Sequence, residues 1–205
     1  EQGVKSKLYS LGIFDYLSKS KPQSNENNDH MRLLYAGTLN LRKNPFLKQM
    51  GPIVKSYKLN LYGSDYVVPE EYKNRINYKG FVASDKLIST AEGDFGLVWD
   101  GDSILSCSGE LGEYLKFNNP HKTSLYIRCH LPIIIWSDAA LANFVKEHKI
   151  GFCIDSLEQI DDLLSGLSKE EYNEIRNNVI KVSDKLSSGY FILTALNSIL
   201  CQKEN

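Results

Sequence analysis

Closely spaced cysteines, an excess of charge of either sign and long apolar runs are all missing from this sequence of 205 residues. Its four cysteines form no C-x-x-C pair, so neither a zinc site nor a disulfide framework is expected, and the thiols suit a reducing cytoplasm. A formal net charge of −1 argues against a nucleic-acid-binding protein. No apolar run approaches the ~20 residues that a membrane-spanning helix requires. A globular domain with a sizeable core remains.

The common nucleotide-binding fingerprints are also missing. The segment Ala36-Gly37-Thr38-Leu39-Asn40 lacks the G-x-G-x-x-G of dinucleotide-binding domains, and no G-x-x-x-x-G-K-[ST] occurs. Asp100 follows a predicted strand, but the acidic pair that a phospho-accepting receiver domain carries after its first strand is absent. Asp100-Gly101-Asp102 has the spacing of a metal-holding D-x-D motif. Two carboxylates without further ligands make a weak site, so we favour a turn there and expect no metal.

From residue 31 onward, short apolar segments alternate with amphipathic ones. Strands are predicted at residues 32–37, 57–63, 76–80, 95–99, 133–136 and 152–154. Helices are predicted near residues 45–50, from Asp85, after Pro120, and from Ser137 or Asp138, with Gly151 ending the last of these. Strands that alternate with helices in this way are parallel and joined by right-handed crossovers. The predicted fold is therefore α/β, a doubly wound Rossmann-like parallel sheet.

The chain is predicted to divide near residue 30. Residues 1–30 are interpreted as the remnant of a preceding domain plus a linker, and residues 31–205 as one domain with its C-terminal helices. The segment 8–17 is apolar enough to be buried against something, whereas the polar tract 21–30 offers no core-forming residue.

The C-terminal tail is predicted to be helical. Ser156 with Gln159 and Ser168 with Glu171 match the capping box, which predicts one short helix and one long helix. Gly189 then separates the long helix from a final one.

A helix start that carries a cation is the most informative local feature, in the run Asn118-Asn119-Pro120-His121-Lys122-Thr123-Ser124-Leu125-Tyr126. Unpaired amides and the positive end of the peptide dipoles make such a start a site for anions, phosphate above all. Lys122 adds a compact positive charge suited to a diphosphate. The simpler interpretation is that Asn119 and Thr123 only cap the helix and that Lys122 is solvated, since helix starts of this composition are common.

The predicted topology brings this helix start next to other candidate residues. Ligands of doubly wound sheets lie outside the carboxyl ends of the strands, where the strand order reverses. Three predicted strands end in glycine at that edge: Gly37, Gly63 and Gly80. Residues 100–117 form an unusually long loop that leads into the helix start, which suggests a functional role. Four residues are therefore expected around one crevice: Thr38, Asp100, Asn119 and Lys122.

The run Gly109-Glu110-Leu111-Gly112-Glu113-Tyr114-Leu115-Lys116-Phe117, continuing into Asn118-Asn119-Pro120-His121-Lys122, resembles the C-terminal, donor-binding domain of bacterial GT-B glycosyltransferases. The branch it is most similar to holds the glucosyltransferase 3-type enzymes that extend sugars on serine-rich-repeat adhesins, and related galactofuranosyltransferases. The similarity covers roughly residues 31 to 200, and Asn-Pro-His-Lys is its most specific part.

This resemblance implies a nucleotide-sugar donor, most often a UDP-sugar such as UDP-glucose or UDP-galactofuranose, and a glycan or glycoprotein acceptor. Lys122 and the helix start would stabilise the diphosphate leaving group without a metal. Thr38 and Asn40 would approach the phosphates or the sugar, and the loop after Gly80 would hold the base largely through backbone groups. The implied binding residues are Gly37, Thr38, Asn40, Phe81, Val82, Asp100, Asn119, Lys122 and Thr123.

A GT-B enzyme has two such domains, and the usual catalytic base lies in the other domain or in the cleft between them. We therefore assign no catalytic residue, and we expect this chain to bind donor without transferring sugar. The rival hypothesis is a non-catalytic α/β interaction module that forms a homo-oligomer through its helical tail. An exposed apolar face on that tail, rather than a buried Tyr172/Ile175/Val179 stripe, would favour the rival.

Overall fold

The computed structural model describes residues 9–23 and 30–201 of the chain. Within them, six parallel strands form one sheet in the order β3-β2-β1-β4-β5-β6. The strands are β1 (Arg32–Ala36), β2 (Lys58–Tyr62), β3 (Ile76–Gly80), β4 (Phe95–Val98), β5 (Ile133–Trp136) and β6 (Gly151–Ile154). Strands β1, β2 and β3 follow one another toward one edge of the sheet. The chain then crosses back, and β4, β5 and β6 follow one another from β1 toward the other edge. The predicted doubly wound Rossmann-like sheet is confirmed.

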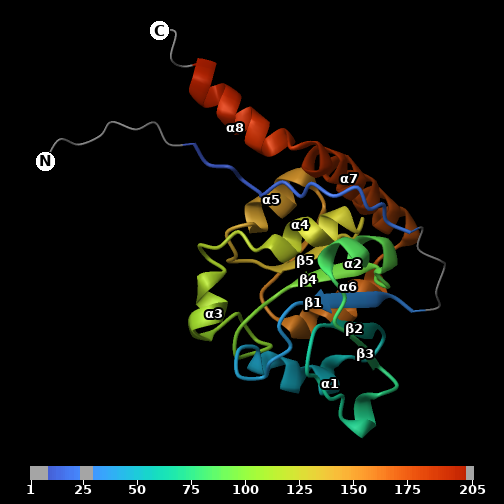
Figure 1. Cartoon of the computed structure of the whole chain (residues 1–205). Coiled ribbons are helices and arrows are strands. Elements are labelled where there is room, and N and C mark those ends of the chain that lie inside the picture. The colour runs from blue at the N-terminus through green and yellow to red at the C-terminus, as the bar shows by residue number, and fades with distance from the viewer. Residues whose placement is uncertain (1–8, 24–29, 202–205) are drawn as a thin grey trace, which may run out of the picture.

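Helices cover both faces of the sheet. The α-helices are α1 (Met50–Ile53), α2 (Ser84–Thr90), α3 (Gly109–Tyr114), α4 (His121–Arg128), α5 (Ala142–His148), α6 (Ile160–Gly166), α7 (Lys169–Ser188) and α8 (Tyr190–Cys201). Short 3₁₀ turns span Pro45–Gln49, Glu70–Tyr72 and Leu157–Gln159. Figure 1 shows α2, α4 and α5 on one face and α1 on the other, with α7 laid across α4 and α5.

The central strands are apolar because both of their faces are covered. Every residue of β4 and β5 is buried, including the run Ile133-Ile134-Ile135-Trp136. A continuous apolar strand of this kind is typical of a parallel sheet between two helical layers. Strand β2 alternates apolar and polar residues, yet its polar residue Asn60 is also buried, so neither side of its centre faces solvent.

Several predicted helix boundaries are wrong. Ala83 is the N-cap of α2 and Asp85 lies in the first turn without capping it. α5 begins only at Ala142, and the Ser137 hydroxyl donates to the Asp155 carboxylate instead of capping. The predicted loop 100–117 is interrupted by α3.

Gly151 does not end a helix. Lys149, in the left-handed conformation, ends α5, and Gly151 is the first residue of β6. A Cβ atom on Gly151 would lie 1.9 Å from the carbonyl oxygen of Ile133 on the neighbouring strand. Glycine is therefore required by the close approach of two backbones, which a single-strand pattern does not reveal.

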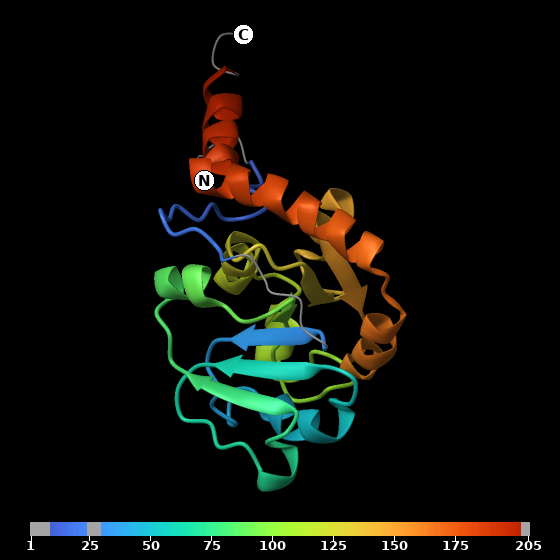
Figure 2. The ribbon, with the colours of Figure 1, turned by 90° about the vertical axis from the view of Figure 1, so that its right-hand side faces the viewer.

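The helical tail follows the prediction. Both capping boxes are formed, at Ser156 with Gln159 and at Ser168 with Glu171. Gly189 ends α7 in the left-handed conformation with φ 75°, and α8 leaves the body of the domain beyond it (Figures 1 and 2). Within the described part of the chain, no helix is both long and apolar enough to cross a lipid bilayer.

Residues 12–20, here called the N-terminal strap, run alongside α7 as an extended segment (Figure 1). Ile13 of the strap is fully buried, and the amide of Tyr16 donates to the carbonyl oxygen of Leu186 near the end of α7 at 3.1 Å. The predicted burial of the apolar segment 8–17 therefore holds for Ile13, whereas Tyr9, Phe14 and Leu17 are exposed. Residues 1–8, and residues 24–29 of the predicted linker, lie outside the described residues.

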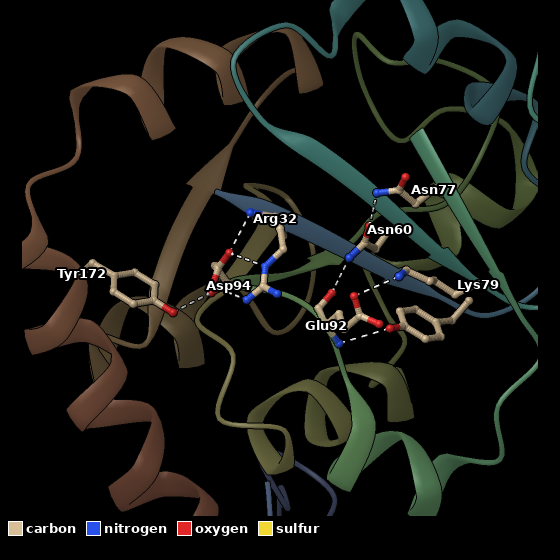
Figure 3. Close-up of polar contacts among 8 residues, drawn as sticks. Arg32, Asn60, Asn77, Lys79, Glu92, Asp94 and Tyr172 are labelled. Atoms are coloured by element: carbon tan, nitrogen blue, oxygen red, sulfur yellow. Dashed lines mark hydrogen bonds and ion pairs between the residues drawn. The ribbon is translucent and has the colours of Figure 1, made fainter. Parts of the chain in front are cut away.

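A partly buried ion pair joins the amino ends of β1 and β4 (Figure 3). The guanidinium of Arg32 donates to both carboxylate oxygens of Asp94, at 3.0 and 3.1 Å, and this bond raises the pKa of Arg32. The hydroxyl of Tyr172 on α7 donates to the backbone carbonyl of Asp94 at 3.3 Å. The first turns of α7 are thereby tied to the sheet edge opposite the carboxyl ends of the strands.

The buried Asn60 side chain has its polar groups satisfied by neighbours (Figure 3). Its amide nitrogen donates to the carbonyl oxygen of Glu92 at 2.6 Å, and its oxygen accepts from Asn77 at 2.9 Å. The Glu92 carboxylate in turn pairs with Lys79. Because the Asn60 groups are bonded, the buried polar side chain need not destabilise the fold.

Candidate functional site

The site begins where β1 and β4 separate. The two strands pair only at their first residues, Leu33 with Phe95 and Leu34 with Gly96. Beyond that point the hydroxyl of Tyr126, on α4, accepts a bond from the amide of Ala36 at 2.7 Å and donates to its carbonyl oxygen at 3.2 Å. The end of β1 is therefore held by a helix instead of by β4, and a crevice opens at the point where the strand order reverses.

Gly96 makes this arrangement possible. A Cβ atom on Gly96 would lie 2.5 Å from the ring of Tyr126. The absence of a side chain lets the Tyr126 ring cross β4 and reach Ala36. The sequence analysis did not identify Tyr126, and the glycine inside a buried strand was the available signal for a close approach.

Loops at the carboxyl edge are bonded one to the next. The amide of Gly37 donates to the carbonyl oxygen of Tyr62, and the amide of Gly63 donates to that of Gly80, both at 3.0 Å. A Cβ atom on Gly63 would lie 2.2 Å from the Gly37 carbonyl oxygen, so glycine is needed there for the loops to pack.

These loops, α4 and part of the strap enclose a cavity of about 1030 Å³. Seven of the predicted residues line it: Gly37, Thr38, Asn40, Phe81, Val82, Asp100 and Lys122. The cavity is large enough for a nucleotide-sized ligand. The predicted crevice is thus present at the predicted edge of the sheet.

Two predicted residues do not line the cavity. The amide nitrogen of Asn119 donates to the carbonyl oxygen of Gly12 in the strap at 3.1 Å. Thr123 is fully buried, and its hydroxyl has no partner in the described part of the chain. Consecutive helical residues point in directions about 100° apart, so Lys122 and Thr123 cannot face the same cavity.

The capping alternative for these residues is also wrong. Pro120 is the N-cap of α4, and no side chain of residues 9–23 or 30–201 caps this helix start. The amide of Thr123 donates to the carbonyl oxygen of Pro120 at 2.9 Å, which leaves the amides of His121 and Lys122 without a helical partner.

The ammonium of Lys122 has a defined position. It donates to a carboxylate oxygen of Asp100 at 2.8 Å, and to the backbone carbonyl of Trp99 and the hydroxyl of Tyr35 at 3.4 Å each. It also lies 4.6 Å from the centre of the Tyr35 ring. The Lys122 side chain is 16% exposed, so it is largely desolvated and yet reaches the cavity wall. The proposal that Lys122 is a solvated surface cation is wrong.

Tyr35, on β1, is a second residue that the sequence analysis missed. Its hydroxyl donates to the same Asp100 oxygen at 3.0 Å. Burial, followed by the nearby Asp100 charge, raises the pKa of Tyr35 well above its ordinary value. Tyr35 therefore remains a neutral hydrogen-bond donor.

The two carboxylates of the D-x-D motif have different neighbours. Asp100 is engaged by Lys122 and Tyr35, whereas the Asp102 carboxylate lies against Gly109, where an added Cβ would come within 2.2 Å of it. Among the described residues, no group of three or more histidine, cysteine, aspartate or glutamate side chains is placed to hold a metal ion.

The N-terminal strap forms part of the cavity wall. Tyr16 lines the cavity, and the ring of Phe14 stacks on His121 with 4.9 Å between ring centres. Further bonds run from the Ser124 hydroxyl to the Phe14 carbonyl oxygen, and from Arg128 to those of Ser18 and Ser20. Residues assigned by sequence to a preceding domain and linker thus contact the helix that carries Lys122.

Comparison with known proteins agrees with this geometry. Residues 33–199 match the family described as glucosyltransferase 3-like, C-terminal domain. The chain belongs to this family. It is 36% identical over 197 residues to the β-1,6-galactofuranosyltransferase WbbI of Escherichia coli strain K12, a match that covers 95% of this chain and 57% of WbbI. This chain thus spans little more than half the length of WbbI.

Solved structures show the same fold at low identity. The lipopolysaccharide outer core galactosyltransferase WaaB superposes with a TM-score of 0.57 at 13% identity, over 94% of this chain and 56% of WaaB. HepE from Anabaena, solved in complex with UDP-glucose, superposes with a TM-score of 0.54 at 13% identity, over 85% of this chain and 48% of HepE. The fold of this glucosyltransferase 3-like domain is that of the C-terminal half of a GT-B glycosyltransferase.

Proposed function

We propose that this chain is the donor-binding half of a glycosyltransferase and that its cavity binds a UDP-sugar, such as UDP-glucose or UDP-galactofuranose. The observation that carries the proposal is the position of the Lys122 ammonium and of the first residues of α4, His121 and Lys122, at one wall of a cavity at the strand-order switch. Family membership supports it, as does the UDP-glucose complex of the structurally similar HepE.

The diphosphate is assigned to Lys122 and the first amides of α4. Both supply positive charge where the leaving group develops negative charge as the bond to the sugar breaks. Thr38 and Asn40 are assigned to the phosphates or the sugar. The loop after Gly80, with Phe81 and Val82, is assigned to the base, and Phe81 is 73% exposed at the cavity and so free to cover a ligand. Asn119 and Thr123 then act by shaping the helix start instead of by direct contact.

We propose that no metal is needed for donor binding. The positive charge of Lys122 is already in place, and the Asp100 carboxylate is engaged by Lys122 and Tyr35. A magnesium ion usually binds through one or two carboxylates together with the substrate phosphates. Addition of EDTA should therefore leave UDP affinity unchanged.

Transfer itself requires an acceptor, for which we propose a glycan or glycoprotein hydroxyl. That oxygen forms the new bond to the anomeric carbon, the bond to the diphosphate breaks, and the hydroxyl proton passes to a base. The base is proposed to lie in the part of the enzyme that corresponds to the remainder of WbbI, since this chain matches 57% of that relative. A reducing cytoplasm is the proposed setting, because Cys107, Cys129 and Cys153 are free thiols.

Titration calorimetry with UDP tests the proposal. Replacement of Lys122 by methionine keeps the side-chain length and removes the charge, and should weaken UDP binding about 10- to 100-fold, the range for a hydrogen bond to a charged group. Lys169→Met, at the exposed start of α7, is the matched control and should bind UDP like the wild type. Titrations with GDP and dTDP identify which nucleobase the cavity prefers. Absence of UDP binding by the wild type, or equal affinity of the Lys122→Met variant, would contradict the proposal.

The interaction-module alternative is supported by one observation. Of the Tyr172/Ile175/Val179 stripe, Val179 is fully buried, and Tyr172 and Ile175 are partly buried, so the stripe faces the core rather than solvent. On α8, however, Leu193 and Leu196 are about half exposed, at 54% and 48%. We propose that α8 contributes to an interface, either in a homo-oligomer or within the longer enzyme. Light scattering of the chain at several concentrations measures whether it forms a homo-oligomer.

A further inference from the structure

The Asp100 carboxylate and the groups around it form a compact network beneath the cavity. One carboxylate oxygen accepts from Lys122 at 2.8 Å and from the Tyr35 hydroxyl at 3.0 Å. The Tyr35 hydroxyl also accepts from Lys122 at 3.4 Å, and the ammonium lies over the Tyr35 ring. Each of the three side chains therefore contacts the other two.

The rigidity of the three members differs. Tyr35 is fully buried in β1, in the middle of the sheet, and its ring packs edge-on against Phe46 at 5.5 Å between ring centres. Lys122 has a long side chain that would otherwise sample many rotamers, and fixing it in one of them costs conformational entropy. The buried strand residue is thus the fixed point of the network, and the lysine is the residue that gains a fixed position from it.

We propose that Tyr35 is a positioning residue for Lys122, acting through its hydroxyl on Asp100 and on the ammonium and through its ring. This inference rests on the proposed function, in which Lys122 receives the donor diphosphate. A lysine that is already ordered loses less conformational entropy when the diphosphate arrives, so binding is tighter than it would be to a mobile side chain. Asp100 accepts a bond from the ammonium at 2.8 Å and holds it in place until the donor binds.

The alternative is that the Tyr35 hydroxyl only satisfies a partly buried carboxylate and so stabilises the fold. Both roles predict that loss of the hydroxyl lowers stability. Only the positioning role predicts that its effect on UDP binding depends on Lys122 being present. A double-mutant cycle separates the two, because residues that act through one another are not additive.

The experiment measures UDP affinity by calorimetry and melting temperature for the wild type, Tyr35→Phe, Lys122→Met and the double variant. Tyr35→Phe keeps the ring and removes the hydroxyl, and should weaken UDP binding about three- to tenfold, the range for one hydrogen bond. In the Lys122→Met background the same substitution should change UDP affinity less than about twofold. Tyr57→Phe is the matched control, because Tyr57 is a buried tyrosine whose hydroxyl has no partner in the described part of the chain; it should leave UDP affinity unchanged.

Equal loss of UDP affinity in both backgrounds, or no loss in either, would overturn the positioning role while the proposed function stands. Failure of the wild type to bind UDP would instead overturn the proposed function. A measurement that needs no variant guards against misfolding of Tyr35→Phe. In the ligand-free wild type, NMR relaxation should show the Lys122 side chain to be more rigid than that of Lys169, and equal mobility of the two would also overturn the inference.

Discussion

At the scale of single residues, one buried hydroxyl controls the geometry at the mouth of the cavity. Tyr126 bonds both backbone groups of Ala36, the residue that precedes the Gly37 loop. Burial raises the pKa of Tyr126 far above its ordinary value, so the hydroxyl keeps its proton and can serve as donor and acceptor at once. On the side where β4 no longer pairs with it, the end of β1 therefore has its hydrogen bonds satisfied by a side chain.

Removal of this hydroxyl should destabilise the domain. Tyr126→Phe leaves the buried amide of Ala36 without a partner, which costs about 1–3 kcal/mol of unfolding free energy. Urea denaturation measures the change. Tyr57→Phe, in which a hydroxyl without a partner is removed, should change the unfolding free energy by less than about 0.5 kcal/mol. If the two variants were equally stable, Tyr126 would not have the structural role assigned to it.

Sequence patterns predicted which residues line the cavity better than they predicted the hydrogen-bond partners of those residues. Lys122 was predicted from the composition of a helix start, and it lines the cavity. Thr123 was predicted with it, but a composition does not specify which way successive helical residues point. Tyr35 was missed because it reads as one more apolar residue of a buried strand. Its role depends on Lys122, which lies 87 positions away in the chain.

At the scale of elements, the strap connects the helix that carries Lys122 to the tail. It receives bonds from α4 through Ser124 and Arg128. Its Asp15 carboxylate accepts from the backbone amides of Phe191 and Ile192, at 3.2 and 2.7 Å, at the start of α8. A carboxylate at a helix start satisfies free amides and interacts favourably with the helix dipole.

Asp15→Ala should loosen the start of α8. Loss of a capping side chain costs about 0.5–2 kcal/mol. Hydrogen exchange should become faster at the amides of Phe191 and Ile192, while the exchange of amides in β5 stays unchanged. Asp85→Ala is the matched control, because Asp85 lies in the first turn of α2 without capping it. Unchanged exchange at the start of α8 would show that Asp15 does not hold this helix.

At the scale of the whole molecule, stability is expected to depend on pH through two histidines. Burial is the main cause that lowers the pKa of His130 below 6.5, helped by the positive charges of Arg176 and Arg128 and opposed by Asp184. Burial and the charge of Lys185 lower the pKa of His148 in the same way. Both side chains are therefore harder to protonate in the folded protein than in the unfolded chain.

The free energy of unfolding should fall as the pH is lowered from about 7 to about 5. Above 6.5 both states carry neutral histidines, and below it the unfolded chain takes up protons that the folded protein excludes. His130→Asn removes one of these groups, and asparagine suits the left-handed backbone at that position, where φ is 59°. Urea denaturation across this pH range should show a shallower decline for the variant. An identical pH dependence would exclude His130 as a source of the effect.

The sequence by itself determined the sheet, its winding and the edge at which a ligand can bind. Strand and helix periodicity, glycines at strand ends and the handedness of crossovers are local or general rules, so no knowledge of specific contacts was required. The tertiary structure alone decided that Tyr126 replaces a strand at Ala36, that Tyr35 and Asp100 hold Lys122, and that the strap lines the cavity. A pattern of residue types reports burial, whereas a hydrogen-bond partner is selected by the packing of segments far apart in the chain.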